Sequence, residues 1–375
     1  MKKLICFDYN KVEKETFDKR CIFSRFVMHP TLRHVDRFDY FNQFSRYNFV
    51  TFNTPKPKEN KSLDYKELVL QRAQYFAQQY PDGIAIAYSG GVDSVGIICA
   101  LLAIGYPVRK LHILCNRFAI TEYPHFFNQL AYWGCKITLS KKWEITEHFD
   151  RASENVILTG HCNDQYFHLY RCYQEPELHC IPIEQSLSIL YKRRGIEEYF
   201  EQDFDRYLTY SRLLNWDVED LFDLAVLINF GCHYTYVQDH IKLHILNPDT
   251  RDKVTTFYDG QALQDWAFTY RKENKEQWKL SLNDPAFYKK QLKDLIREVY
   301  PDEEYLKTKS KGCSWEHGVK DMAEGVTPYA FFGLHDEEGY HVSLFDRYLD
   351  KGEDRKTLWE IQKILIKDYL KEEFK

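Results

Sequence analysis

The 375-residue sequence lacks several features that would place it in a familiar class of protein. It has no C-x-x-C pair among its 10 cysteines, and only 16 glycines and 12 prolines. This scarcity, together with 44% hydrophobic and 29% charged residues, argues against a disordered or fibrous chain. The scattered cysteines indicate neither a zinc ribbon nor a disulfide framework, so we expect reduced, mostly buried thiols.

Long hydrophobic runs are also missing. The longest uncharged stretches, residues 94–108 and 224–238, are shorter than the roughly 20 apolar residues that a membrane helix needs. The sequence starts with basic residues but becomes charged again before a signal-peptide core can form. We therefore expect a cytoplasmic protein with no membrane partner.

There is no excess of positive charge. Lys and Arg number 51 against 56 Asp and Glu, a formal net charge of −5. Nucleic acid is therefore not indicated as a partner, because binding it would need a local basic patch. At roughly 150 residues per domain, the length predicts about two structural units.

Short apolar runs of strand length alternate with helical patterns between residues 63 and 160. The pattern predicts strands at 84–88, 111–115, 137–139 and 156–159, and helices at 65–80, around 95–102 and at 124–133. Such alternation is typical of right-handed βαβ units and predicts an α/β fold with a doubly wound parallel sheet. From Gln165 to about Arg297 the pattern becomes mostly helical.

The clearest chemical signal lies between the first of these strands and its helix. It reads Ser89-Gly90-Gly91-Val92-Asp93-Ser94. Two glycines let the backbone approach a ligand, the serines offer hydroxyls, and the first N–H groups of the helix favour an anion such as phosphate. Asp93 would repel a bare phosphate, which suggests an intervening Mg²⁺. The alternative is an ordinary strand-to-helix turn of small residues.

This hexapeptide resembles the S-G-G-x-D-S pyrophosphate loop of the N-type ATP pyrophosphatases, the PP-loop superfamily. The superfamily includes asparagine synthetases, β-lactam synthetases, tRNA thiolases and deazaguanine-forming enzymes. The resemblance implies an adenine nucleotide alpha hydrolase-like sheet, with ATP and Mg²⁺ bound by all six residues of the loop. It also implies attack by a substrate oxygen on the α-phosphate of ATP, with release of pyrophosphate.

A second segment, residues 159–170, resembles the asparagine synthetase motif G-E-G-A-D-E-L-F-G-G-Y. Gly160, Asp164, Phe167 and Tyr170 stand in matching places, whereas Gln165 replaces the second acid. The resemblance implies that Gly160 contacts the nucleotide and that Asp164 is a second magnesium ligand that assists catalysis. The alternative reading makes Asp164 only a cap at the start of a buried helix.

Three further elements resemble later parts of the same family. Residues 256–259 resemble P-F-L-D, residues 289–293 resemble K-x-x-L-R, and residues 307–312 resemble the basic segment that follows. The match implies that Lys289 is catalytic and stabilises the departing pyrophosphate, with Lys290 or Lys293 in that role if the register is shifted. Leu114, on the second strand, would line the adenine pocket. A solvated helix with a lysine face is the simpler alternative.

The resemblance covers residues 66–312 as an asparagine synthetase-like domain. It leaves residues 1–65 as an amino-terminal segment of unknown role and 313–375 as a carboxyl-terminal extension. The implied reaction is adenylation of a substrate carboxylate, then amide formation with ammonia or an amine. Because Lys2 follows Met1, no nucleophilic cysteine stands at the position that glutamine-using relatives need, so a separate glutaminase is a candidate partner. Alternatives are a tRNA-thiolating or deazaguanine-forming enzyme, or a catalytically silent ATP-binding regulator.

Overall fold

The computed structural model describes most of the chain between residues 64 and 309, together with short pieces of both ends. The described ranges are 2–6, 36–38, 40, 55–60, 64–140, 149–167, 177–178, 181–193, 195–234, 237, 245, 247–280, 284–309, 331–336 and 339–341.

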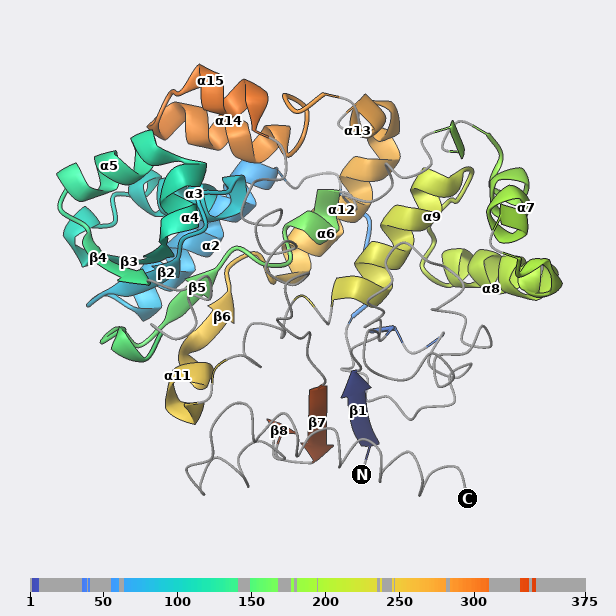
Figure 1. Ribbon diagram of the computed structural model, residues 1–375, viewed down its shortest axis with the longest axis horizontal. Helices are drawn as coiled ribbons and strands as arrows, with labels where there is room; N and C mark the ends of the chain where they lie inside the picture. The colour runs from blue at the N-terminus through green and yellow to red at the C-terminus, as the bar shows by residue number, and fades with distance from the viewer. Residues whose placement is uncertain are drawn as a thin grey trace.

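A five-stranded parallel sheet organises the described structure (Figure 1). Its strands are β2 (Ile84–Ala87), β3 (Leu111–Asn116), β4 (Lys136–Ser140), β5 (Ile157–Thr159) and β6 (Val254–Thr256). They lie in the order β4-β3-β2-β5-β6, and every neighbouring pair is parallel. The predicted α/β class is confirmed, and the order 3-2-1-4-5 is consistent with a Rossmann-like nucleotide-binding fold.

The direction of the strand order reverses between β2 and β5. Strands β3 and β4 lie on one side of β2, whereas β5 and β6 lie on the other. In open α/β sheets, ligands bind outside the carboxyl ends of the strands at such a switch point. The loop 89–94 follows β2 and the segment 160–164 follows β5, so the two strongest sequence motifs meet at this place.

Four helices share one hydrophobic core with one face of the sheet. They are α2 (Tyr65–Gln79), α3 (Val92–Ala103), α5 (Pro124–Tyr132) and α14 (Lys290–Val299). The alternate residues of the strands, Ala85, Ala87, Leu114 and Ile157, form a second cluster with Phe149, Ala152, Ile245 and Val254. Because side chains alternate along a strand, this second cluster covers the opposite face. Both faces are therefore buried, as a parallel sheet requires.

Helices α3 and α14 approach each other closely at Gly96. A Cβ atom on Gly96 would lie 2.5 Å from Leu292 Cδ1 and 2.8 Å from the hydroxyl oxygen of Tyr258. A larger residue at this position would displace the buried side chains of Leu292 and Tyr258. The contact fixes the start of α14, and with it Lys289, against α3. We call residues 89–94, which lie just before and at the start of α3, the phosphate-type loop.

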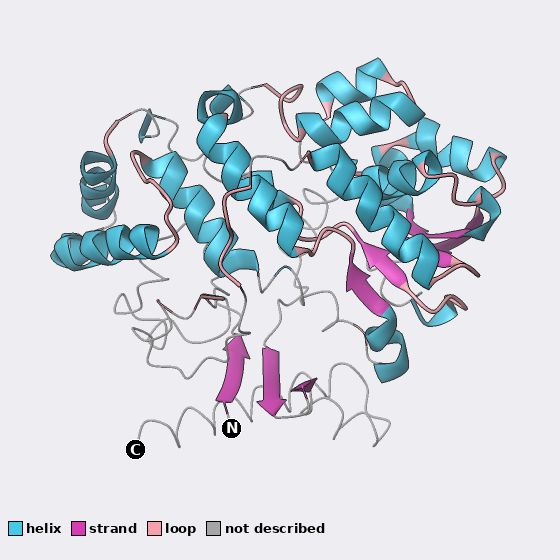
Figure 2. Cartoon of the chain, turned by 180° about the vertical axis from the view of Figure 1, so that it is seen from behind, coloured by secondary structure: helices cyan, strands magenta, loops and turns pink. Residues whose placement is uncertain are grey.

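A mainly helical region follows the sheet, as predicted, and extends away from it in Figure 2. Its helices, with the shorter ones of the sheet region, are α4 (Arg117–Glu122), α6 (Asp164–Phe167), α7 (Ile183–Arg193), α8 (Phe200–Leu213), α9 (Leu221–Ile228), the π-helical turn Asn229–His233, α11 (Pro248–Lys253), α12 (Gln261–Glu273), α13 (Lys275–Leu280) and α15 (Glu303–Thr308). A buried ion pair between Arg271 and Asp223, 2.7 Å long, joins α12 to α9. The Arg271 guanidinium also lies over the Trp216 ring, 3.9 Å from its centroid.

A small antiparallel sheet pairs residues 2–6 with segments between residues 331 and 341. Strand β1 (Lys2–Cys6) pairs with β7 (Phe331–Asp336), which forms a hairpin with β8 (Gly339–His341) (Figure 1). Residues 55–60, in the amino-terminal segment, are bonded to the helical region, because the backbone N–H groups of Lys58 and Asn60 donate to α12. The domain limits at residues 65 and 312 stay predictions.

Two further expectations concern membrane helices and cysteines. Within the described ranges, no helix is both long enough and apolar enough to cross a bilayer. The cysteines at 99, 115 and 135 are buried thiols, in line with the expectation from their scatter.

Candidate functional site

The loop after β2 is organised by its own hydroxyl groups. The Ser94 hydroxyl donates to the Gly91 carbonyl over 3.0 Å and accepts from the Ser89 N–H over 3.2 Å. Gly91, the N-cap of α3, offers no side chain to cap the helix. The first turn of this 12-residue helix is therefore open to an anionic ligand, as the sequence predicts for a phosphate site.

Gly90 shows why this loop needs glycine. Its φ angle is +75°, and a Cβ atom there would lie 2.5 Å from the Ala119 carbonyl oxygen and 2.6 Å from Glu122 Cβ. The left-handed backbone and the close neighbours each exclude a larger residue. The Val92 side chain is buried in the main core, so Val92 could contact a phosphate only through its backbone.

Lys289 brings the separate motifs together. Its side-chain ammonium pairs with Asp93 of the phosphate-type loop and lies 2.6 Å from Asp164 Oδ1 at the start of α6. The lysine side chain is 2% exposed, against 21% and 26% for the two aspartates. The structure thus joins the three charged residues that the sequence motifs single out. It excludes the register in which Lys290 takes this place, because Lys290 pairs with Asp294 instead.

Neutral side chains hold the two carboxylates in position. Asn163 donates from Nδ2 to Asp93 Oδ1 over 2.6 Å, and the buried Tyr65 hydroxyl donates to Asn163 Oδ1 over 2.9 Å. The Tyr288 hydroxyl donates to Asp164 Oδ1 over 2.5 Å. The site is therefore a connected polar network, which fixes the geometry of its charged groups.

Gly160 allows the loops after β2 and β5 to touch. A Cβ atom on Gly160 would lie 2.9 Å from Asp93 Cβ and 3.3 Å from the Ser94 backbone nitrogen. Tyr258, in the segment after β6, donates from its hydroxyl to the Asp93 carbonyl over 2.9 Å. All three strand ends therefore contribute to the placement of Asp93.

The turn before α14 determines where Lys289 points. Lys289 has a φ of 53°, a left-handed conformation that is uncommon for a residue with a side chain. Buried Lys293 supports the turn, since its ammonium donates to the carbonyls of Pro285 and Lys309, 2.7 Å each. Lys293 is thus a structural neighbour of the site and not the cation that reaches Asp93.

The charges of the site influence one another strongly. Burial raises the pKa of Asp93, and the nearby Asp164 carboxylate adds to this, while Lys289 acts against it. Burial pushes the pKa of Lys289 down, but Asp164 and Asp93 outweigh it and the pKa lies above its usual value. Lys289 is therefore charged at neutral pH. The two carboxylates therefore share one positively charged ammonium.

The donor set suits magnesium. Mg²⁺ is commonly held by one or two carboxylates, with phosphate oxygens and water completing its octahedron. Asp93 and Asp164 meet at the shared lysine and can supply those carboxylates. Among the described residues there is no group of three or more His, Cys, Asp or Glu side chains, the kind of set that would hold zinc.

Two stacked tyrosines lie next to the phosphate-type loop, where the Tyr305 hydroxyl donates to the Gly90 carbonyl. Tyr123 and Tyr305 stack with ring centroids 3.6 Å apart and planes inclined by 2°. Beside them, Lys309 pairs with Glu122, which itself adjoins Gly90. The predicted basic segment therefore reaches the loop through Lys309, while its residues 310–312 lie outside the described ranges.

Leu114 is less directly connected with this site. It is fully buried beside Ala87, in the cluster on the sheet face opposite α3. Its contact with adenine stays a prediction.

Three residues of the site, Asn163, Tyr288 and Tyr65, were not predicted from the sequence. No local spacing in the sequence marks them.

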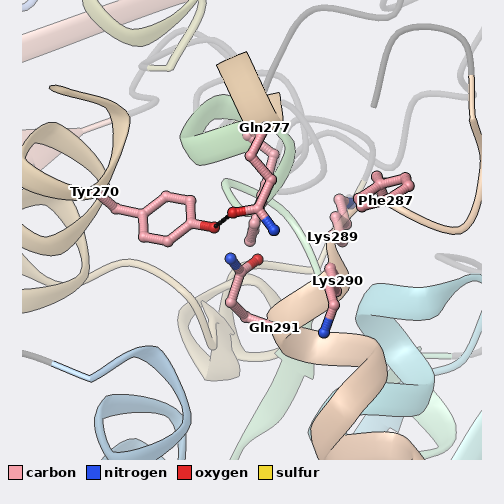
Figure 3. A pocket seen from close by; sticks show the side chains of 7 residues that line it. Tyr270, Gln277, Phe287, Lys289, Lys290 and Gln291 are labelled. Atoms are coloured by element: carbon pink, nitrogen blue, oxygen red, sulfur yellow. Dashed lines mark hydrogen bonds between the residues drawn. The ribbon is translucent and has the colours of Figure 1, made fainter. Parts of the chain in front are cut away.

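A pocket adjoins Lys289 on the side of α12 and α13 (Figure 3). Its lining residues are Phe167, Tyr270, Gln277, Phe287, Lys289, Lys290 and Gln291. The Tyr270 hydroxyl donates to Gln277 Oε1 over 3.1 Å. The pocket combines aromatic walls with two carboxamides, which can both donate to and accept from a polar ligand.

Comparison with known proteins gives no assignment. No model of a known protein family matches the chain, and no curated protein matches it. The functional argument therefore depends on the residues and their geometry.

Proposed function

We propose that this protein binds ATP with Mg²⁺ at the carboxyl ends of β2 and β5, and uses it to adenylate a substrate carboxylate. One observation carries the proposal: Lys289 pairs with both Asp93 and Asp164 at the switch point of a parallel sheet. These three residues come from three separate motifs that resemble the PP-loop superfamily, and the fold brings them to one place.

In this proposal the loop 89–94 and the first turn of α3 hold the β- and γ-phosphates. Asp93 and Asp164 hold the magnesium ion, which would neutralise phosphate charge when bound. A carboxylate oxygen of the acceptor attacks the α-phosphorus, and the bond between that phosphorus and the bridging oxygen breaks to release pyrophosphate. The ammonium of Lys289 stabilises the negative charge that grows on the leaving group.

The second half of the proposed reaction forms an amide. The nitrogen of ammonia or an amine attacks the acyl carbon of the adenylate. AMP then leaves with the former carboxylate oxygen, and the amine loses a proton to solvent. This makes the protein an ATP-dependent C–N ligase similar to the asparagine synthetases.

Isotope transfer tests the first half, with ammonia as the nitrogen source. The protein is incubated with ATP, Mg²⁺ and a panel of carboxylic acids labelled with ¹⁸O in the carboxylate. After addition of ammonium salts, we expect AMP that carries one ¹⁸O, with one pyrophosphate released for each AMP. Formation of ADP and orthophosphate instead would contradict adenylation.

The same assay of AMP and pyrophosphate, extended to transfer RNA and heterocyclic acids, separates the alternatives. Turnover with transfer RNA or a heterocyclic acid, and none with simple acids, would favour a thiolating or deazaguanine-forming enzyme. ATP binding without turnover across all acceptors would favour a silent ATP-binding regulator.

A further inference from the structure

The ammonium of Lys289 occupies a position that two carboxylates share. It pairs with Asp93 and lies 2.6 Å from Asp164, while its side chain is 2% exposed. We infer that Lys289 is an internal counter-cation that competes with the divalent metal for Asp93 and Asp164. In the nucleotide-free protein it keeps the metal out, so that metal and nucleotide bind together.

The hydrogen bonds around the carboxylates support this role. Asp93 accepts from Asn163 at Oδ1 and from Lys289 at Oδ2. Asp164 Oδ1 is within bonding distance of both Lys289 and the Tyr288 hydroxyl. A metal ion that binds Asp93 Oδ2 and Asp164 Oδ1 must therefore displace or shift the ammonium, because these are the two oxygen atoms that contact Lys289.

Charge makes this exchange depend on the nucleotide. The two carboxylates and the ammonium leave a net charge of about −1, and a divalent ion placed beside the ammonium would be repelled by it. ATP brings three phosphate groups, which offer oxygen ligands to the metal and negative charge to the lysine. The four-carbon stem of lysine is flexible enough to move its ammonium from a carboxylate to a phosphate.

The backbone at Lys289 suits a residue with two bonding states. Its left-handed φ of 53° is held by the surrounding contacts, and such conformations often occur in switch regions. Lys293 anchors the same turn to the Pro285 and Lys309 carbonyls. The side chain of Lys289 can therefore exchange partners while its backbone stays in place.

Binding of Mn²⁺ to the nucleotide-free protein, followed by electron paramagnetic resonance, tests the inference. In Lys289→Met, which keeps the length of the side chain without its charge, we expect Mn²⁺ affinity to rise at least tenfold over wild type. Lys290→Met removes the neighbouring exposed ammonium and should leave Mn²⁺ affinity unchanged. Adding Asp164→Asn to Lys289→Met should abolish the gain.

The inference rests on the proposed nucleotide site, but this measurement involves no turnover. A folded Lys289→Met protein that binds Mn²⁺ no more tightly than wild type would overturn it, even if pyrophosphate release is observed. If that variant does not fold, Lys289→Gln, which also lacks the charge, is measured in the same way. An affinity for Mn²⁺ at least tenfold above wild type supports the exchange, and an affinity equal to that of wild type refutes it.

Discussion

The hydroxyl of Tyr305 on α15 donates a hydrogen bond to the carbonyl of Gly90, 3.0 Å away, and so ties the helix after α14 to the phosphate-type loop. Tyr305→Phe removes only this donor. We expect the free energy of unfolding to fall by about 1 kcal/mol and ATP affinity to fall as the loop loosens. Chemical denaturation and nucleotide titration measure the two effects. Tyr132→Phe, at a ring that is 85% exposed, should change neither.

Gly160 is a second point where the site depends on close contact. Gly160→Ala places a methyl group 2.9 Å from Asp93 Cβ and forces the loops after β2 and β5 apart. We expect a loss of about 1–3 kcal/mol in the free energy of unfolding and a marked loss of ATP binding. The matched control is Gly260→Ala, because nothing lies within 4 Å of the added methyl there. Equal behaviour of the two variants would contradict the close approach.

Asp93→Asn keeps the shape of the side chain and removes its charge. We expect ATP-dependent turnover to be lost, because the phosphate-type loop loses its only carboxylate. Because Asp93 pairs with buried Lys289, we also expect a loss of about 1–3 kcal/mol in the free energy of unfolding. Asp294→Asn, at an exposed ion pair, is the control. Undiminished turnover in Asp93→Asn would end its proposed role.

Lys289→Met tests stabilisation of the leaving group. If Lys289 acts on charge that develops in the transition state, kcat should fall roughly 10²-fold or more, a larger factor than any change in ATP affinity. Kinetics at saturating ATP and a separate binding titration distinguish these quantities. Lys66→Met removes an exposed ammonium paired with Glu298 and should keep wild-type kcat. A change in ATP affinity alone would reduce Lys289 to a ground-state contact.

Much of the sheet could be predicted because its strands are short apolar runs bounded by turns. The strand expected at 84–88 is β2 (Ile84–Ala87), and the one expected at 111–115 is β3 (Leu111–Asn116). Strand β6 was missed. It is three residues long, Val-Thr-Thr, and nearly a hundred residues of mostly helical pattern separate it from β5. Its place comes from parallel pairing with β5, a long-range contact that local periodicity does not encode.

The charged residues of the site could be predicted and their supports could not. Asp93 belongs to a loop whose residue types already suggest phosphate and magnesium chemistry, whereas Asp164 and Lys289 were singled out by the resemblance of their motifs to the PP-loop superfamily. Tyr288 reaches Asp164 across 124 residues of sequence, and Asn163 reaches Asp93 across 70. A tyrosine or asparagine in a loop has many roles, so only the folded contact identifies these two as part of the network.

Lys293 gives the site a dependence on pH. Burial, helped by the charge of nearby Lys289, lowers the pKa of Lys293 to about 8. A lysine in the unfolded chain has a pKa of about 10.4. Below pH 8 both states are protonated, and the folded state bears the full cost of a buried charge. Between pH 8 and about 10.4 the unfolded state holds more protons, so stability contributed by this residue rises with pH.

The prediction compares wild type with Lys293→Met, which cannot titrate. The variant loses the hydrogen bonds to Pro285 and Lys309, so it should be less stable, but the neutral amine of wild type keeps two N–H donors for those carbonyls. From pH 8 to pH 10 the free energy of unfolding of wild type should therefore rise by roughly 1–2 kcal/mol relative to the variant. Urea denaturation at a series of pH values measures the difference, with Lys290→Met expected to follow wild type. A difference that stays constant, or that falls as the pH rises, would show that Lys293 does not titrate in this range in the folded protein.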